Sequence, residues 1–132
     1  MNSQIQESPA VSIARAHVEA WSNHRFDEAR KSLSDDVKVH ATTTQPIMTD
    51  TNTVGADAYM TGLQMFAQGV KPGSAKVIAA TGDKHNALLF VTVRASFGPG
   101  APELTLPAAR LYLVDDAGKI TSEKVIFYAA EG

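Results

Sequence analysis

LTLPAARLYLVDDAGKITSEKVIFYA (residues 104–129) is the stretch that decides the fold of this chain. Two runs rich in apolar and β-branched residues, 104–114 and 120–129, flank the turn-forming sequence DDAGK. This pattern predicts an antiparallel β-hairpin. Proline is rare inside a central strand, so Pro107 predicts either an edge position or a bulge there.

Arg110 is the unusual residue of this hairpin, because it places a charge among Ala, Leu and Tyr. If the turn sets Val114 opposite Lys119, then Arg110 lies opposite Glu123, and directly opposite residues share a face of the sheet. We therefore expect Arg110 and Glu123 to be neighbours that form an ion pair. A ligand contact stays open for Arg110, because a guanidinium has five N–H donors.

The segments upstream of the hairpin complete an α+β pattern. Residues 75–81 and 86–97 predict two more strands, joined by turns that contain glycine or proline. Apolar residues recur at helical spacing after Ser8-Pro9, again over 26–33, and again over 56–70. Helices first and an antiparallel meander afterwards predict an α+β fold with the helices on one face of a curved sheet.

The segment between the second and third predicted helices has no clear period. VKVHAT (37–42) alternates and predicts a short strand. Residues 41–54 contain many threonines and no helical spacing, so they predict a long loop. Loops of this length are often functional, and this one is a candidate lid.

Length and composition narrow the class of protein. The 132 residues predict one domain over 1–132, with 1–8 as a flexible N-terminal segment. The net charge of −2 and the scattered Lys and Arg residues argue against a nucleic-acid partner. The chain has no cysteine, which suits a cytoplasmic location, and no apolar run of the ~20 residues that a membrane span needs. No His or acidic pair has metal-ligand spacing, so neither a metal nor a cofactor is expected.

Three stretches carry a family resemblance: AHVEAWSNHRFDEARKSLSDDVKVH (16–40), VGADAYMTGL (54–63) and LYLVDDAGKITSEKVIFY (111–128). In this order and at this spacing, the chain resembles the nuclear transport factor 2-like superfamily. That superfamily includes SnoaL-like polyketide cyclases, ketosteroid isomerases and limonene-epoxide hydrolases. The resemblance implies three N-terminal helices packed on a strongly curved, mainly antiparallel sheet, which together form a cone with an internal pocket.

The resemblance also implies which side chains face that pocket. In relatives, alternate residues of the last two strands point inward, and the third helix closes the pocket. The ligand-binding candidates implied here are Trp21, Tyr59, Leu63, Arg94, Arg110, Tyr112, Glu123 and Phe127. The catalytic candidates are His17 and His40, because a buried imidazole can exchange protons near neutral pH.

The known chemistries of the family match this chain only in part. A ketosteroid isomerase would carry its base where this chain has Ala41, with His17 and Arg110 at its two oxyanion positions. Since alanine cannot accept a proton, that route is not expected. SnoaL-like cyclases use an acid–base residue, commonly Asp with a supporting His, and His17, His40 or Glu123 could serve.

The epoxide-hydrolase pattern is also incomplete. Arg94 matches its arginine, but Ser96 and Val125 stand where its two aspartates belong. We therefore expect a small-molecule-binding protein with an apolar pocket and a polar or cationic anchor, whose chemistry would be that of a cyclase, isomerase or dehydratase. The alternative is a non-catalytic ligand carrier or a homodimerisation module. In either case a homodimer is expected through an outer apolar face formed by Val91, Ala109, Leu111, Leu113 and Ile126.

Overall fold

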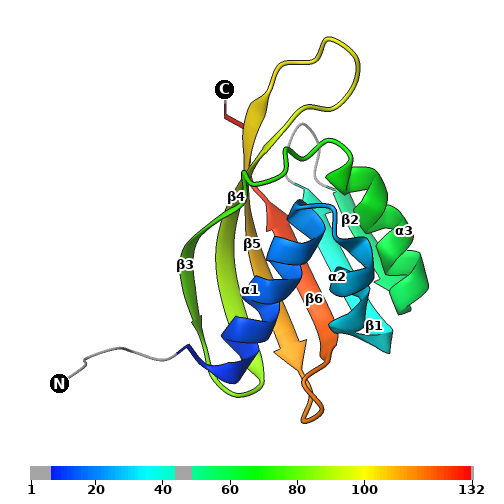
Figure 1. Ribbon diagram of the computed structural model, residues 1–132, viewed down its shortest axis with the longest axis vertical. Coiled ribbons are helices and arrows are strands. Elements are labelled where there is room, and N and C mark those ends of the chain that lie inside the picture. The colour runs from blue at the N-terminus through cyan, green and yellow to red at the C-terminus, as the bar shows by residue number, and fades with distance from the viewer. Residues whose placement is uncertain (1–6, 44–48, 132) are drawn as a thin grey trace, which may run out of the picture.

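A six-stranded sheet curves over three helices in the computed structural model, which describes residues 7–43 and 49–131 (Figure 1). The helices are α1 (Pro9–Ser22), α2 (Phe26–Lys31) and α3 (Ala56–Ala67). The strands are β1 (Leu33–Thr43), β2 (Thr49–Val54), β3 (Lys76–Gly82), β4 (Asn86–Ala95), β5 (Leu104–Val114) and β6 (Ile120–Phe127). Residues 1–6 of the expected flexible segment lie outside the described residues.

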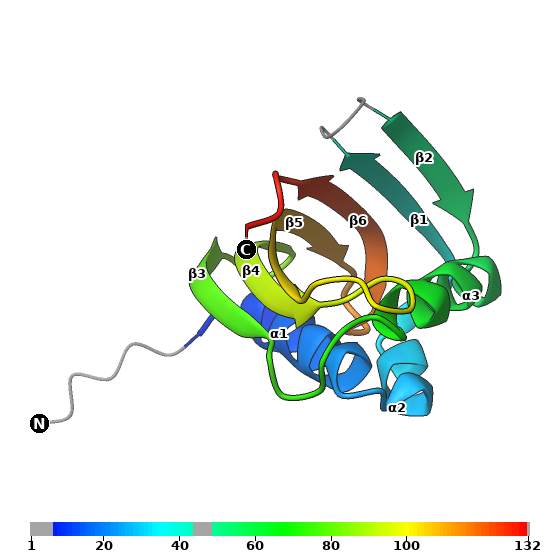
Figure 2. The ribbon, with the colours of Figure 1, turned by 90° about the horizontal axis from the view of Figure 1, so that it is seen from above.

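The strands run in the order β2-β1-β6-β5-β4-β3, and only the β1–β6 pair is parallel among the described residues. Seen from above, the strands form an arc with the helices on its inner side (Figure 2). Buried apolar side chains of the helices and of the inner sheet face make one hydrophobic core. The architecture is the α+β fold that the sequence predicts, and the sheet is not closed into a barrel.

Helix α1 begins where the sequence indicates. The Ser8 hydroxyl accepts a hydrogen bond from the Val11 amide at 3.4 Å, and Pro9 occupies the first helical position. Both features are typical of helix starts, because the first amides have no partner inside the helix. The buried face of α1 brings His17 and Trp21 against the sheet.

The β5–β6 hairpin forms with a register two residues away from the expected one. Arg110 is opposite Val125, and Tyr112 is opposite Glu123. The cause is an irregularity next to the turn, where the pairing shifts between Leu113 and Val114. A shift of two residues keeps every side chain on its face of the sheet, so Arg110 and Glu123 still share the inner face.

The expected loop over 41–54 is wrong in its described parts. β1 continues to Thr43, and β2 starts at Thr49, with pairing from Lys38–Val54 to Thr43–Thr49. Threonine is β-branched and favours strands, so the threonine-rich sequence extends the sheet. Residues 44–48, the remainder of the expected lid, lie outside the described residues.

Pro107 lies in a central strand but beyond the end of the neighbouring β6, so on that side it occupies an edge position, as expected. It pairs with Thr92 of β4, and its carbonyl accepts a hydrogen bond from the Tyr128 amide at 2.9 Å. Because β6 ends at Phe127, opposite Ala108, no strand residue on that side needs the N–H that proline lacks.

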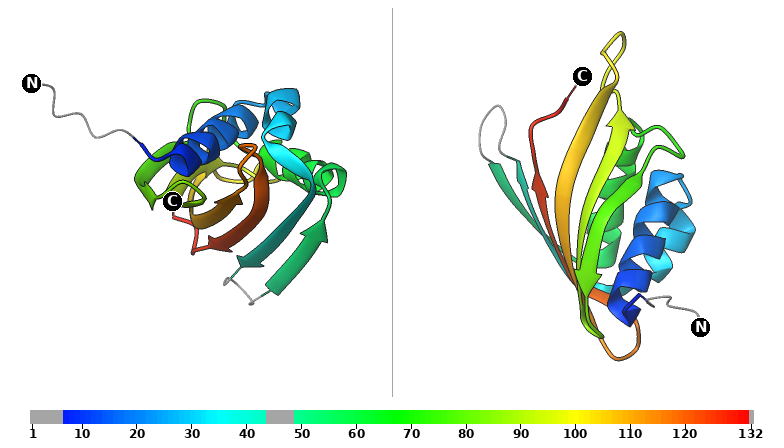
Figure 3. Two further views of the ribbon diagram at one scale, coloured as in Figure 1. Left: turned by 90° about the horizontal axis from the view of Figure 1, so that it is seen from below. Right: turned by 90° about the vertical axis from the view of Figure 1, so that its left-hand side faces the viewer.

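Two boundaries also differ from expectation. α3 ends at Ala67 instead of position 70, and β1 starts at Leu33, where the second helix was expected to end. The outer face of the sheet carries no helix among the described residues (Figure 3).

Candidate functional site

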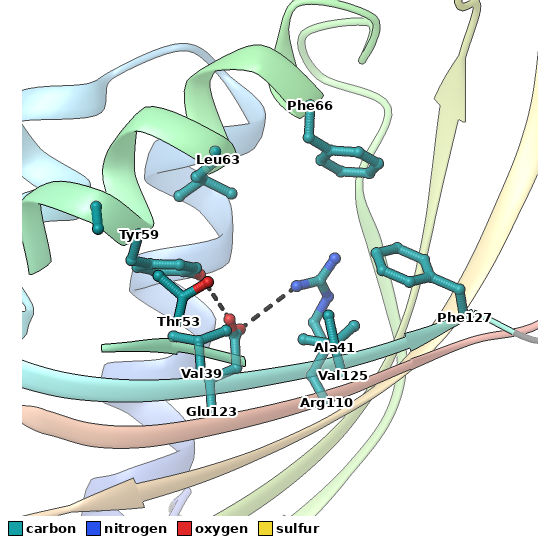
Figure 4. A pocket seen from close by; sticks show the side chains of 12 residues that line it. Val39, Ala41, Thr53, Tyr59, Leu63, Phe66, Arg110, Glu123, Val125 and Phe127 are labelled. Carbon is teal, nitrogen blue, oxygen red and sulfur yellow. Dashed lines mark hydrogen bonds and ion pairs between the residues drawn. The ribbon is translucent and has the colours of Figure 1, made fainter. Parts of the chain in front are cut away.

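One pocket lies between α3 and the strands β1, β2, β5 and β6. Tyr59, Leu63 and Phe66 follow one another at spacings of four and three on α3, so they project from the same helix face toward the sheet (Figure 4). Arg110 of β5 and Glu123 of β6 rise from the sheet beneath them.

The pocket has a volume of about 200 Å³ and a mostly apolar wall. It is lined by Val39, Ala41, Thr53, Ala58, Tyr59, Gly62, Leu63, Phe66, Arg110, Glu123, Val125 and Phe127. Pockets for drug-sized ligands usually span about 300–1,000 Å³, so this one suits a smaller molecule. Arg110, Glu123 and Tyr59 form its polar end.

Arg110 pairs with Glu123, as expected, but not all of its N–H donors have hydrogen-bond partners. Only 4% of the residue is exposed, and Nη1 donates to Glu123 Oε2 at 3.4 Å. The guanidinium carbon lies 4.9 Å from the Trp21 ring centroid and 5.7 Å from that of Phe127, within cation–π range. Nε is buried with no hydrogen-bond partner in the structure. At least one guanidinium N–H, that of Nε, is therefore without a hydrogen-bond partner next to the polar end of the pocket.

Glu123 holds the pocket and the α3 helix together. The residue is 1% exposed, and Oε1 accepts a hydrogen bond of 2.6 Å from the Tyr59 hydroxyl. A carboxylate offers about four lone-pair sites, and these two contacts use half of them. Glu123 can therefore accept a further donor from the pocket.

His17 is fully buried behind Tyr59 and does not line the pocket. Nδ1 lies 3.1 Å from the Ala29 carbonyl oxygen, and Nε2 lies 3.4 Å from the Tyr59 hydroxyl. Burial lowers the pKa of His17, and the negative charge of Glu123 offsets this only in part. The imidazole is therefore neutral at pH 7.

The two tyrosines of the site remain protonated. Burial, reinforced by the charge of Glu123, raises the pKa of Tyr59 and of Tyr112 well above the usual tyrosine value. The Tyr112 hydroxyl is near enough to Glu123 and Arg110 to feel their charges, yet no hydrogen bond of normal geometry joins it to either. Tyr59 is thus the one tyrosine donor committed to Glu123.

The structure brings five of the expected binding residues to the pocket wall: Tyr59, Leu63, Arg110, Glu123 and Phe127. Trp21 and Tyr112 are buried next to Arg110 but do not line the pocket. They support the guanidinium from behind.

His40 and Arg94 are not part of the candidate site. Val39 lines the pocket, so His40, the next residue of β1, faces the other side of the sheet, where Nε2 lies 3.4 Å from Asp50 Oδ1. Arg94 alternates in the same way with the buried Val93 and binds Glu103 at 2.9 Å. Neither side chain reaches the pocket.

The sequence reasoning missed the β2 contribution to the wall, Thr53, because that segment was expected to be a loop. It also did not select Val39, Ala58 or Gly62. Helical spacing could have found Gly62 and Ala58, which lie beside Tyr59 and Leu63 on α3. Among the described residues, no cluster of three or more His, Asp or Glu side chains could hold a metal ion, and no helix is long and apolar enough to cross a membrane.

Comparison with solved structures finds the same fold in several proteins. A protein from Kribbella flavida DSM 17836 is 29% identical, with a TM-score of 0.72 over 92% of this chain and 88% of that one. An LEH-like epoxide hydrolase from M. tuberculosis is 21% identical, with a TM-score of 0.68 over 91% and 83%. A Mycobacterium tuberculosis protein in complex with estradiol-17β-hemisuccinate is 14% identical, with a TM-score of 0.73 over 90% and 93%.

Comparison by sequence gives the family. No curated protein matches the chain. The family model described as SnoaL-like domain matches residues 14–123, which include every residue of the pocket wall except Val125 and Phe127. This chain therefore belongs to the SnoaL-like domain family.

Proposed function

We propose that the pocket binds a small, largely apolar molecule with a carbonyl or carboxylate end, and that Glu123 removes a proton from this molecule while Arg110 binds its oxygen. One observation carries this proposal: a buried Arg–Glu pair with unused donors and acceptors ends an otherwise apolar pocket. Burying such a pair is costly, and a hydrophobic replacement would often be as stable. A role in recognition accounts for its presence.

The ligand chemistry follows from the atoms that remain free. Arg110 offers only N–H donors, so it selects an acceptor oxygen. Glu123 offers acceptors, so the neighbouring ligand atom should carry a hydrogen. The fold supports this proposal as well, because a solved protein of the same fold binds estradiol-17β-hemisuccinate, an apolar molecule with a carboxylate end.

The reaction class that fits is proton abstraction beside a carbonyl, the step shared by isomerases and by many cyclases and dehydratases. Glu123 would take the proton from carbon as a carboxylate, and Arg110 would hold the enolate oxygen that forms. This assignment replaces the expected bases. His17 does not contact the pocket, and His40 faces the opposite side of the sheet.

Exchange of the α-hydrogens of cyclohexanone in D₂O, followed by proton NMR, tests this function. The wild type should accelerate exchange above the buffer rate, since the carbonyl oxygen can bind Arg110 while Glu123 removes the proton. Glu123→Gln should reduce the added rate at least about tenfold, because a positioned general base contributes roughly 10²–10⁴-fold. A wild type that binds cyclohexanone without accelerating exchange would reject the catalytic part and favour a ligand carrier.

Gly62 provides a matched pair of control variants. A Cβ at this position would meet no atom within 4 Å, and Gly62 lines the pocket. Both Gly62→Ala and Gly62→Phe remove a helix-destabilising glycine, but only the phenylalanine adds a large side chain at the pocket wall, where we expect it to obstruct ligand entry. Exchange should persist in Gly62→Ala and be lost in Gly62→Phe. Equal rates in the two variants would place the reaction outside this pocket.

We also propose that the outer sheet face forms a homodimer. Leu88, Leu111, Leu113, Ile126 and Tyr128 are 37–46% exposed on strands β4 to β6 and just after β6. Val91, which was expected there, is instead buried in the core at 2% exposure, so it is not part of this face. Exposed apolar clusters of this kind usually mark an interface.

Light scattering after size exclusion should show a mass of twice 14.1 kDa for the wild type. Leu111→Glu should shift the mass to one chain, because it places a carboxylate in the apolar face, beside Lys124 on the neighbouring strand. Met65→Glu, at a 69% exposed position on α3, should leave the dimer intact. A wild type that elutes as a monomer would refute the interface.

A further inference from the structure

His17, Tyr59 and Glu123 form a buried series with one hydrogen too few. His17 Nδ1 faces a carbonyl oxygen, which only accepts, so Nδ1 must carry the ring hydrogen of the neutral imidazole. Nε2 then presents a lone pair to the Tyr59 oxygen, 3.4 Å away. The one hydroxyl hydrogen of Tyr59 is committed to Glu123 Oε1 at 2.6 Å. Two acceptors therefore face each other across the longer contact.

One added proton would satisfy the whole series. If Glu123 takes up a proton on Oε1, its O–H can donate to the Tyr59 oxygen. The Tyr59 hydroxyl is then free to turn and donate to His17 Nε2, and Nδ1–H keeps its bond to the Ala29 carbonyl. No covalent bond changes beyond the one O–H formed on Glu123. Every polar atom of the series then has a partner, which a buried site favours.

We propose that Tyr59 is a two-position hydrogen-bond switch, donating to Glu123 when that carboxylate is charged and to His17 Nε2 when it holds a proton. His17 is then a positioning residue, which supports proton uptake in the pocket without touching the ligand. The proposal rests on the proposed function only where it takes Glu123 as the base, and the switch itself needs no ligand.

The two other polar residues beside the switch, Arg110 and Tyr112, do not take the place of Tyr59 between His17 and Glu123. Arg110 faces Glu123 from β5 and can only donate. Tyr112, also on β5, packs edge-on against the His17 ring with centroids 6.3 Å apart and makes no hydrogen bond to it. The charge of Glu123 also acts on His17 directly, but among the described residues Tyr59 is the side chain whose hydroxyl contacts both His17 Nε2 and Glu123.

Glu123→Gln imitates the protonated carboxyl group and makes the switch observable. Arg110 only donates, so the amide oxygen of the glutamine should turn toward it, and the amide N–H₂ toward the Tyr59 oxygen. Tyr59 then loses its acceptor at position 123 and should donate to His17 Nε2. Side-chain ¹⁵N NMR reads this directly, because an unprotonated ring nitrogen moves upfield when it accepts a hydrogen bond.

The expected result is a bare Nε2 and a protonated Nδ1 in the wild type, with an upfield shift of Nε2 in Glu123→Gln. Adding Tyr59→Phe to that variant should abolish the shift, and the exposed His85 should not respond in any variant. An unchanged Nε2 signal in Glu123→Gln would overturn the proposal.

A second measurement keeps the test decisive if Glu123→Gln does not fold. Tyr59→Phe alone should leave the Nε2 signal of His17 nearly unchanged, because Tyr59 does not donate to it in the resting state. A large change, or a wild-type Nε2 that carries a hydrogen, would refute the switch. Failure of the cyclohexanone experiment would reject the reaction but not the switch, so the two outcomes are distinguishable.

Discussion

Arg110→Met is expected to lower the free energy of unfolding by about 3–5 kcal/mol, the usual cost of leaving one charge of a buried pair without its partner. The variant keeps an apolar side chain of similar length against Trp21 and Phe127, so little packing is lost. Glu123 would be left at 1% exposure with Tyr59 as its remaining hydrogen-bond donor. Urea denaturation at pH 7, followed by circular dichroism, measures the change.

The double variant Arg110→Met/Glu123→Met distinguishes the cost of leaving Glu123 without its partner from the loss of the ion pair itself. Removing both charges also removes the desolvation cost, so most of the lost stability should return. Arg94→Met is the matched control, because Arg94 and Glu103 are 38% and 43% exposed and such a pair contributes at most about 1 kcal/mol. Equal losses in Arg110→Met and Arg94→Met would show that the buried pair is not a stabilising contact.

The position of this pair was predictable because the DDAGK turn joins the two strands that carry it, and directly opposite residues share a face of the sheet. β5 spans 104–114 as expected, and its inward residues include Arg110. The expected register was wrong by two residues, since a bulge beside the turn leaves no signal in composition. The pairing was nevertheless found, because an even shift does not change the face of any residue.

The polar hairpin of β1 and β2 shows where sequence reasoning fails. β2 is mostly exposed, so its residues need no apolar alternation, and its strand state depends on pairing with β1. Whether a mostly polar segment forms a strand depends on the strand that it pairs with, so the segment's own sequence does not reveal it. Thr53 of the pocket was missed for this reason.

The predictions for His40 and Arg94 were wrong for a different reason, because the alternation of buried residues along their strands was already visible in the sequence. Val37 and Val39 are buried, so alternation places His40 on the outer face. Val91, Val93 and Ala95 do the same for Arg94. The expectation followed the chemistry of the side chains instead of the alternation of the strand. The same error placed Val91 on the outer face, although it is buried.

Acidification should destabilise the wild type through His17. In the unfolded chain this side chain takes up a proton near pH 6.5, whereas burial lowers the pKa in the folded protein. Below pH 6.5 the unfolded state therefore binds more protons, and the free energy of unfolding falls as the pH decreases. One proton gives a slope of up to about 1.4 kcal/mol per pH unit. Above pH 6.5 this contribution is complete and constant.

Urea denaturation at intervals between pH 7.5 and 5 measures that slope, since this range lies above the titration of ordinary carboxylates. The groups that face His17 are Tyr59, Tyr112, Arg110 and Glu123. Burial is the main cause of the lowered pKa of His17, which the charge of Glu123 opposes and the charge of Arg110 supports. His17→Gln should flatten the dependence, because glutamine does not titrate. If His17→Gln and the wild type lose stability in parallel, the buried imidazole is not the group that titrates, and its place behind Tyr59 would then have no thermodynamic consequence.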